Sequence, residues 1–276
     1  MLRAGFSLLL VLVVSTCAMP RRGKEEVFSK TDLGKKIFFD PILSKDKTIF
    51  CASCHKPQFA YADSTRLSPG VGGKLGARNT PSVMNMASRE AFFWDRRAAT
   101  LEEQARVPIE NSLEMNMHFG KAVKRVAMNK EYKRLFLKFY NQLPNEKNIA
   151  NALAEFQRSL ESDGSAPHDL WIGEIDTKAL NPSQLRGREI FLNKGKCFDC
   201  HFSPDFTGDE YRNIGLYDGQ ELNDKGRFMV SQKPEDLGKF KVPGLRNVEL
   251  TAPYMHNGMF ASLAEVIDFI VIPPIL

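Results

Sequence analysis

The sequence predicts a mainly α-helical protein of two domains, each opened by a short helix and wrapped by long loops. A weak internal repeat carries this prediction, because similar segments at residues 34–39 and 187–192 each precede a Cys-x-x-Cys-His motif. Helical spacing of apolar residues recurs elsewhere in the chain. The intervening stretches 68–81 and 203–243 are rich in Gly and Pro, and loops of this length are uncommon unless they have a function.

Residues 1–18 resemble an export signal. Arg3 gives a positive start, and the apolar run at 6–14 is too short to span a bilayer. Residues 14–17 loosely resemble a lipoprotein cleavage box, but Thr16 is a poor residue before the cysteine. We therefore favour a cleaved signal peptide over a lipid anchor at Cys17, and we expect the protein in the periplasm.

Helical patterns follow in chain order. Leu33, Ile37 and Phe38 share one helical face before the first motif, and Leu185 and Ile190 do so before the second. Asn181 and Pro182 give this second helix an N-cap and a proline in its first turn.

Two further helices lie between these segments. Residues 100–103 (Thr-Leu-Glu-Glu) form a capping box that opens a helix expected to stop near Pro108. A later stripe has helical spacing and consists of Ile149, Leu153, Phe156 and Leu160. The stretch 162–167 contains Gly164 and is the expected linker, which gives domains at 19–164 and 165–276.

Composition limits the classes of partner. Of the 276 residues, 43% are hydrophobic, which is enough for globular cores. The net charge is only +5, and no basic block is interleaved with stacking aromatic residues. We therefore expect no nucleic-acid partner.

The two Cys-x-x-Cys-His motifs, at residues 51–55 and 197–201, predict two covalently bound c-type haems. In such a motif two thiols add to the haem vinyl groups and the adjacent imidazole ligates the iron. A zinc site would need its two pairs closer together, and a redox dithiol needs no following histidine. The expected attachment residues are Cys51, Cys54, His55, Cys197, Cys200 and His201, with iron on His55 and His201.

A catalytic haem also needs a group that moves protons. The stretches 93–97 and 104–114 could supply one. Taken alone, however, Glu114 fits a solvated carboxylate better than a catalytic one, and Trp94 fits a core residue better than a functional one.

Further motifs extend these observations over residues 33–269. The matching segments are both Cys-x-x-Cys-His motifs, 76–82 (Gly-Ala-Arg-Asn-Thr-Pro-Ser), 93–96 (Phe-Trp-Asp-Arg), 104–115, 213–215 (Asn-Ile-Gly) and 240–258, which includes Ala-Pro-Tyr-Met-His-Asn-Gly. Together they resemble the bacterial dihaem cytochrome c peroxidases and their methylamine-utilisation (MauG-type) relatives.

The resemblance implies that the two haems have different roles. The haem on His55 is expected to react with peroxide, with Glu114 as acid–base residue and Gln104 as its polar neighbour. Trp94 matches a tryptophan between the two haems and is expected to relay electrons. The haem on His201 is expected to transfer electrons. Such a division is chemically coherent, because a carboxyl group in an apolar pocket has a raised pKa and can shuttle a proton.

The resemblance also implies a calcium ion between the haems and several partners. Asn79, Thr251 and Pro253 match its binding positions, the last two through backbone carbonyls. The expected partners are hydrogen peroxide, a small periplasmic cytochrome c or copper protein as electron donor, and a second subunit in a homodimer.

Two positions depart from the family pattern. Typical peroxidases carry a His in the loop at 64–76 that caps the resting active haem; here this loop has none, as in the MauG-type branch. The sixth ligand of the C-terminal haem, Met or Tyr in the family, falls on Ile270, which cannot bind iron. The apolar tail 270–276 is unlike what precedes it, which predicts a frameshifted or prematurely ended reading frame and a truncated second domain.

Three functions follow, in this order: peroxide reduction, MauG-type oxidation of a protein or small molecule, and electron transfer without catalysis. The pairing of Glu114 with Gln104 argues against the last.

Overall fold

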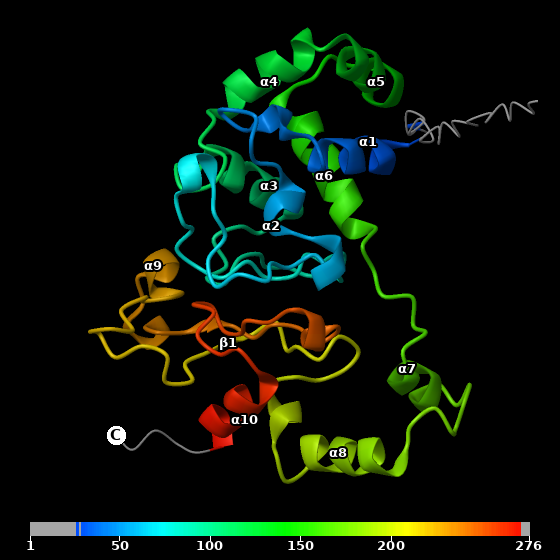
Figure 1. Cartoon of the computed structure of the whole chain (residues 1–276), viewed down its shortest axis with the longest axis vertical. Coiled ribbons are helices and arrows are strands. Elements are labelled where there is room, and N and C mark those ends of the chain that lie inside the picture. Colours follow the sequence, from blue (N-terminus) through cyan, green and yellow to red (C-terminus); the bar gives the residue numbers. More distant parts are fainter. Residues whose placement is uncertain (1–25, 28, 272–276) are drawn as a thin grey trace, which may run out of the picture.

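The chain folds mainly into helices with little sheet. A computed structural model describes residues 26–27 and 29–271 (Figure 1). The expected export signal 1–18, with Cys17, and the tail beyond Val271 lie outside the described residues. The α-helices are α1 (Lys30–Phe38), α2 (Cys51–Cys54), α3 (Leu101–Glu110), α4 (Phe119–Met128), α5 (Lys130–Tyr140), α6 (Glu146–Arg158), α7 (Pro167–Ile172), α8 (Pro182–Leu192), α9 (Phe228–Ser231) and α10 (Leu263–Val271).

Short elements complete the described chain. The 3₁₀ turns are η1 (Pro41–Leu43), η2 (Pro57–Phe59), η3 (Val71–Gly73), η4 (Cys197–Asp199), η5 (Pro234–Asp236) and η6 (Val248–Leu250). Strands β1 (Tyr211–Arg212) and β2 (Phe240–Lys241) pair in antiparallel register, Tyr211 with Lys241. No helix among the described residues is long and apolar enough to cross a bilayer.

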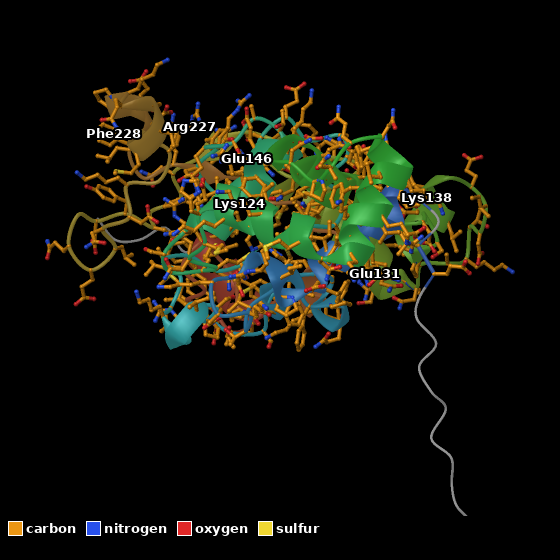
Figure 2. The ribbon with its side chains drawn as sticks, turned by 90° about the horizontal axis from the view of Figure 1, so that it is seen from above. Lys124, Glu131, Lys138, Glu146, Arg227 and Phe228 are labelled. Carbon is orange, nitrogen blue, oxygen red and sulfur yellow. The ribbon has the colours of Figure 1, made fainter. Side chains whose placement is uncertain are left out.

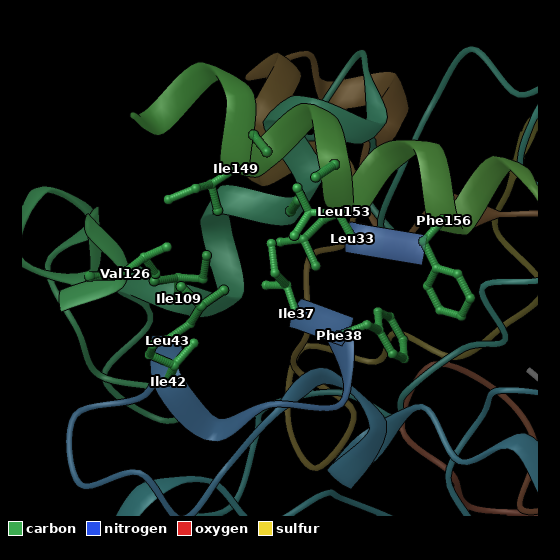
Figure 3. Close-up of a cluster of buried hydrophobic side chains, with 14 of the residues drawn as sticks. Leu33, Ile37, Phe38, Ile42, Leu43, Ile109, Val126, Ile149, Leu153 and Phe156 are labelled. Atoms are coloured by element: carbon green, nitrogen blue, oxygen red, sulfur yellow. The ribbon is translucent and has the colours of Figure 1, made fainter. Parts of the chain in front are cut away.

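The N-terminal part is built on α1 and α6. Leu33 and Ile37 of α1 are fully buried against Ile149 and Leu153 of α6 (Figure 3). Gly34 allows this close contact, because a Cβ there would lie 1.9 Å from the Ala152 carbonyl oxygen. Helix α3 also packs on α6. Residues of α1, α3 and α6 lie beside the first motif.

The predicted helices of this part are present, with two differences. The stripe on α6 is confirmed at its first three positions, whereas Leu160 lies past the helix end and packs against the core. Helix α3 was expected to stop near Pro108 but continues to Glu110. Pro108 has no N–H to donate to the Gln104 carbonyl, so it removes one hydrogen bond from the helix without ending it.

The C-terminal part is more open. The N-cap at Asn181 is confirmed, because its side chain accepts a hydrogen bond from the Gln184 N–H. The apolar residues expected to share one face of α8 are not buried: this helix has no buried residue, and Ile190 is 56% exposed. The core cluster that buries α1 contains no residue of α8. The two similar sequence segments therefore form helices that are buried to different extents.

The two parts share a structural repeat that extends beyond the similar segments seen in the sequence. Residues 162 positions apart share unusual backbone geometry: φ is +58° at both Asn85 and Asn247, and +67° and +71° at Phe93 and Met255. Isolated bridges join Phe92 to Ala98 and, at the same offset, Tyr254 to Phe260. Helices α3 and α10 begin at corresponding positions behind capping hydroxyls (Thr100 and Ser262).

The two parts exchange reciprocal backbone hydrogen bonds. The Asn79 N–H donates to the His256 carbonyl (2.7 Å), and the Lys241 N–H donates to the Trp94 carbonyl (2.8 Å). Both donors and both acceptors are related by the offset of 162. A salt bridge from Arg78 to Asp224 joins the same surfaces. Trp94 and His256 are therefore structural counterparts that meet where the repeats face each other.

Candidate functional site

The first motif forms a one-turn helix with an oriented imidazole. Cys51 and Cys54 stand at the two ends of α2, and neither forms a disulfide. Nδ1 of His55 lies 3.0 Å from the Tyr61 carbonyl oxygen, which accepts a hydrogen bond from its N–H. Left-handed φ angles at Ala60 and Tyr61 turn the chain so that this carbonyl reaches the ring. Nε2 is left free as a metal ligand, and burial lowers the His55 pKa, so the ring stays neutral.

The second motif repeats this arrangement. Cys197 opens η4, and Nδ1 of His201 lies 2.8 Å from the Phe206 carbonyl oxygen. Phe206 has a φ of +56°, and burial again lowers the pKa of the histidine. Both motifs thus present two thiols and one imidazole with a defined tautomer, which is the donor set that a c-type haem requires. The residues present fit two such groups.

A pocket beside the first motif contains the predicted proton-transfer residues. Gln104 and Glu114 line it together with Cys51, Cys54 and His55. The rest of the lining is mostly apolar and consists of Phe38, Ile49, Phe50, Ala105, Pro108, Met115, Leu153 and Gln157. Residues 104 and 114 are brought together because α3 carries the first and the turn after α3 carries the second.

Glu114 is electrostatically suited to carry a proton. Burial raises the pKa of its carboxyl group above the usual range, and the hydrogen bond from Asn111 and the nearby charge of Arg97 only partly oppose this. The Asn111 side-chain amide donates to Glu114 Oε1 at 2.6 Å. A solvated carboxylate, the alternative interpretation, would show no such shift.

The loop without histidine is fixed against Glu114. The Val71 N–H donates to the Glu114 carbonyl at 2.8 Å. A Cβ on Gly70 would lie 2.0 Å from the Leu113 carbonyl oxygen, so only glycine fits this approach. The loop therefore packs on the backbone of residues 113 and 114.

Two polar residues at this site were not predicted individually. Gln157 is 4% exposed in the pocket wall, and its position four residues after Leu153 on the apolar stripe of α6 was the available signal. Asn111 was included in the matching segment 104–115 but had no assigned role; the Asn-x-x-Glu spacing of a local side-chain hydrogen bond could have indicated it.

Trp94 lies at the junction of the two parts. Its indole N–H donates to the Asn79 carbonyl at 2.9 Å. Its ring meets that of His256 edge to face, with centroids 6.5 Å apart, and His256 in turn stacks on Phe240 at 3.6 Å. Burial lowers the pKa of His256 to about 4, so this stack is uncharged at neutral pH.

The remaining histidines have structural positions. His118 is exposed and caps α4, since its Nδ1 accepts a hydrogen bond from the Gly120 N–H. His168 lies against the Phe206 ring with centroids 5.3 Å apart. Neither lines the pocket of the first motif.

The second motif lacks the polar residues of the first pocket. At the offset of 162, Gln104 corresponds to Val266 and Pro108 corresponds to Ile270. Pro108 lines the first pocket, so Ile270 occupies the equivalent place in the second part; it is 54% exposed on α10. An aliphatic side chain has no lone pair to donate to iron.

Of the three expected calcium positions, Asn79 lies at this junction. The buried Asn79 side-chain amide donates to the Thr65 and Arg66 carbonyls, and no donor to its Oδ1 is observed among the described residues. Within those residues no group of three or more His, Cys, Asp or Glu could hold a metal ion. A calcium ion here would depend on neutral oxygens, which calcium accepts.

Comparison with known proteins places the chain in a family. The model of the di-haem cytochrome c peroxidase family matches residues 28–176. Methylamine utilization protein MauG of Methylorubrum extorquens is 39% identical over 242 residues, covering 87% of this chain and 67% of that protein. Cytochrome c551 peroxidase of Nitrosomonas europaea is 38% identical over 240 residues, covering 86% and 71%. The chain therefore belongs to the di-haem cytochrome c peroxidase family.

Solved structures agree with this assignment. A MauG-like protein associated with microbial copper homeostasis is similar with a TM-score of 0.80 and 30% identity, covering 87% of this chain and 75% of that one. The diheme peroxidase BthA of Burkholderia thailandensis has a TM-score of 0.76 at 25% identity, covering 87% and 70%. The family implies two c-type haems, so the Cys-x-x-Cys-His prediction is consistent with an independent comparison.

Proposed function

We propose that this protein reduces hydrogen peroxide to water at the haem held by Cys51, Cys54 and His55. The observation that supports this most directly is the presence of Glu114 and Gln104 in the same largely apolar pocket as that motif. When bound, haem iron supplies a coordination position for peroxide and accepts and donates single electrons. The overall reaction consumes one peroxide, two electrons and two protons and yields two water molecules.

Glu114 moves the proton in this proposal. Its carboxylate accepts a proton from the peroxide oxygen that would bind the iron. It then returns the proton to the other oxygen, which leaves as water when the O–O bond breaks. A raised pKa suits both steps, because the group can hold a proton and release it near neutral pH. Asn111 holds the carboxyl group in place by donating a hydrogen bond to its Oε1. Gln104 lines the same pocket, where its side-chain amide can donate a hydrogen bond to the substrate.

Electrons reach this pocket from the second site. Trp94 lies between the repeats and is hydrogen-bonded to Asn79, so its ring is held in place. We propose that it relays electrons from the haem on His201, which a small periplasmic cytochrome c or copper protein reduces. A calcium ion at Asn79, Thr251 and Pro253 would hold the same junction together.

A MauG-type oxidase is the second candidate, and one observation favours it. The loop at 64–76 has no histidine, and its Val71 and Gly70 pack on the backbone of residues 113–114. The first haem is thus expected to react without prior reduction. An electron carrier without catalysis is less well supported, because it would not need a buried Glu114.

Peroxide turnover with reduced cytochrome c tests the proposal. We expect steady oxidation of the cytochrome that depends on peroxide and stops in Glu114→Gln protein. Absence of turnover, together with oxidation of an added protein or small-molecule substrate by the peroxide-treated protein, would favour the MauG-type function instead.

A further inference from the structure

Positive charge is concentrated in one short segment of the chain. Residues 119–147, which span α4, α5 and the start of α6, contain eight basic and two acidic residues. This segment alone is therefore more positive than the whole chain, whose net charge is +5. The remaining residues together carry a slight negative charge, so the molecule is electrically polarised along its fold.

Seven of these basic side chains are exposed and form what we call the basic face. Its members are Lys121, Lys124, Lys130, Lys133, Arg134, Lys138 and Lys147. Arg125, the eighth basic residue, points inward instead and donates to the Ile42 and Ser44 carbonyls. In the described part of the chain, no member of the basic face belongs to an ion pair.

The two acidic residues of the segment do not neutralise this face. Glu131 pairs with Lys36 of α1 at 3.4 Å, and Glu146 pairs with Arg106 of α3 at 3.0 Å. Both carboxylates are thus engaged by cations outside the segment. The helices bury their opposite sides through Ala122, Val126, Leu135 and Phe136, so the charged side chains lie on the exposed side.

Exposed apolar side chains stand among these cations. Met128 at the corner between α4 and α5 is 84% exposed, and Leu137 and Leu143 are 45% and 51% exposed. A helical surface with lysines around single exposed apolar residues has the composition of a segment that rests on a lipid headgroup layer. Figure 2 looks down on this end, with Lys124 and Lys138 labelled.

The position of the basic face argues against a docking site for an electron carrier. Figure 1 shows α4 and α5 at one end of the long axis and α8, which leads to Cys197, at the opposite end. A carrier bound to α5 would be remote from the motif at 197–201. Lys30, the first residue of α1, lies 4.8 Å above the Tyr140 ring at the end of α5. The sequence before α1 contains three further basic residues, Arg21, Arg22 and Lys24.

We propose that α4 and α5 bind the surface of a phospholipid bilayer that carries anionic headgroups. Each lysine or arginine near such a surface contributes about 1 kcal/mol, a factor of about five in affinity. In this orientation the C-terminal part with residues 197–201 faces away from the lipid. It would then remain accessible to soluble electron donors.

Vesicle sedimentation with the haem-loaded protein recovered after export tests this proposal. The probes are phosphatidylcholine vesicles with and without roughly one third phosphatidylglycerol. The test variant is K124Q/K133Q/R134Q/K138Q. The matched control, K178Q/R186Q/K225Q/K233Q, removes the same charge from exposed positions in the C-terminal part. Peroxide turnover in solution should be unchanged in both, which confirms that each variant is folded.

We expect binding only to the anionic vesicles, a loss of at least about 100-fold in the test variant, and near-normal binding in the control. Binding should also weaken as salt rises from about 0.05 M to about 0.5 M. Equal binding by both variants would overturn the proposal and assign any binding to the N-terminal segment. No vesicle binding, with charge-dependent binding to polyglutamate, would overturn it in favour of an acidic protein partner.

Discussion

The two motif regions share one backbone frame but differ in what surrounds them. The first lies on a closed core formed by α1, α3 and α6, and its pocket contains Gln104 and Glu114. The second follows α8, which buries no residue, and the equivalents of Gln104 and Pro108 are the aliphatic Val266 and Ile270. In the proposed mechanism a common scaffold positions two haems, and a few side chains on α3 and in the turn after it determine which haem handles protons.

The largest expected effect comes from the cysteines. Cys51→Ala with Cys54→Ala should leave one haem per chain instead of two and abolish peroxide turnover, because the pocket with Glu114 loses its cofactor. The matched change, Cys197→Ala with Cys200→Ala, should also leave one haem. Haem staining after denaturation and intact mass would count them. Two retained haems in either variant would refute the assignment of the motifs.

Replacing the acid–base residue is the next largest change. Glu114→Gln should lower turnover by about 10²–10⁴-fold while both haems stay attached, since general acid–base catalysis is typically worth this much. Glu110→Gln is the control, because Glu110 is exposed and bound to Arg106 rather than to the pocket. A near-normal rate in Glu114→Gln protein would place the proton relay elsewhere.

The fixed loop offers a smaller, structural test. Gly70→Ala should destabilise the protein by about 1–3 kcal/mol, because the added methyl group would overlap the Leu113 carbonyl and displace residue 114. Gly76→Ala is the control, since its Cβ would meet no atom closer than 3.6 Å. Thermal unfolding measures both, and equal melting temperatures would mean that the loop does not hold Glu114.

A sixth ligand should distinguish the second site from the first. Ile270→Met places a thioether where the repeat positions Pro108 in the first part, so the C-terminal haem should become low-spin with a shifted reduction potential. A near-infrared methionine–haem band would report the ligation. No spectral change would mean that residue 270 does not face the haem held by His201.

The smallest expected effect is a shift of the pH profile. The carboxylate form of Glu114 must accept the first proton, so turnover falls as pH drops through its pKa. Burial raises that pKa, and the Asn111 hydrogen bond opposes the rise. Asn111→Leu removes the opposing bond, so the acidic limb of the rate profile should move to higher pH. A shift to lower pH would contradict this role of Asn111.

Sequence alone predicted the parts of this fold that depend on local patterns. The caps at Thr100 and Asn181 and the stripe on α6 were confirmed, because capping and helical spacing are properties of neighbouring residues. The exposure of α8 was not predicted, since burial depends on what packs against a helix. Gln157 was missed for the same reason: only tertiary packing turns that face of α6 toward the pocket.

The roles of Glu114 and Trp94 came from family resemblance rather than from their immediate surroundings. The structure adds a physical reason for the first, namely a buried carboxyl group with a raised pKa beside His55. For the second it adds the reciprocal hydrogen bonds that place the indole between the repeats. The roles themselves stay predictions until tested.

One measurement tests most directly whether peroxide chemistry belongs to the first site. The all-ferric protein and its two double-cysteine variants are each mixed with hydrogen peroxide, and the haem absorption and electron paramagnetic resonance are followed in time. We predict a high-spin signal that reacts without prior reduction in the protein and in Cys197→Ala/Cys200→Ala, which keeps the haem at residues 51–55. Cys51→Ala/Cys54→Ala should not react. A fully low-spin resting protein that needs reduction first, or an equally fast reaction when only the haem at residues 197–201 remains, would contradict the account.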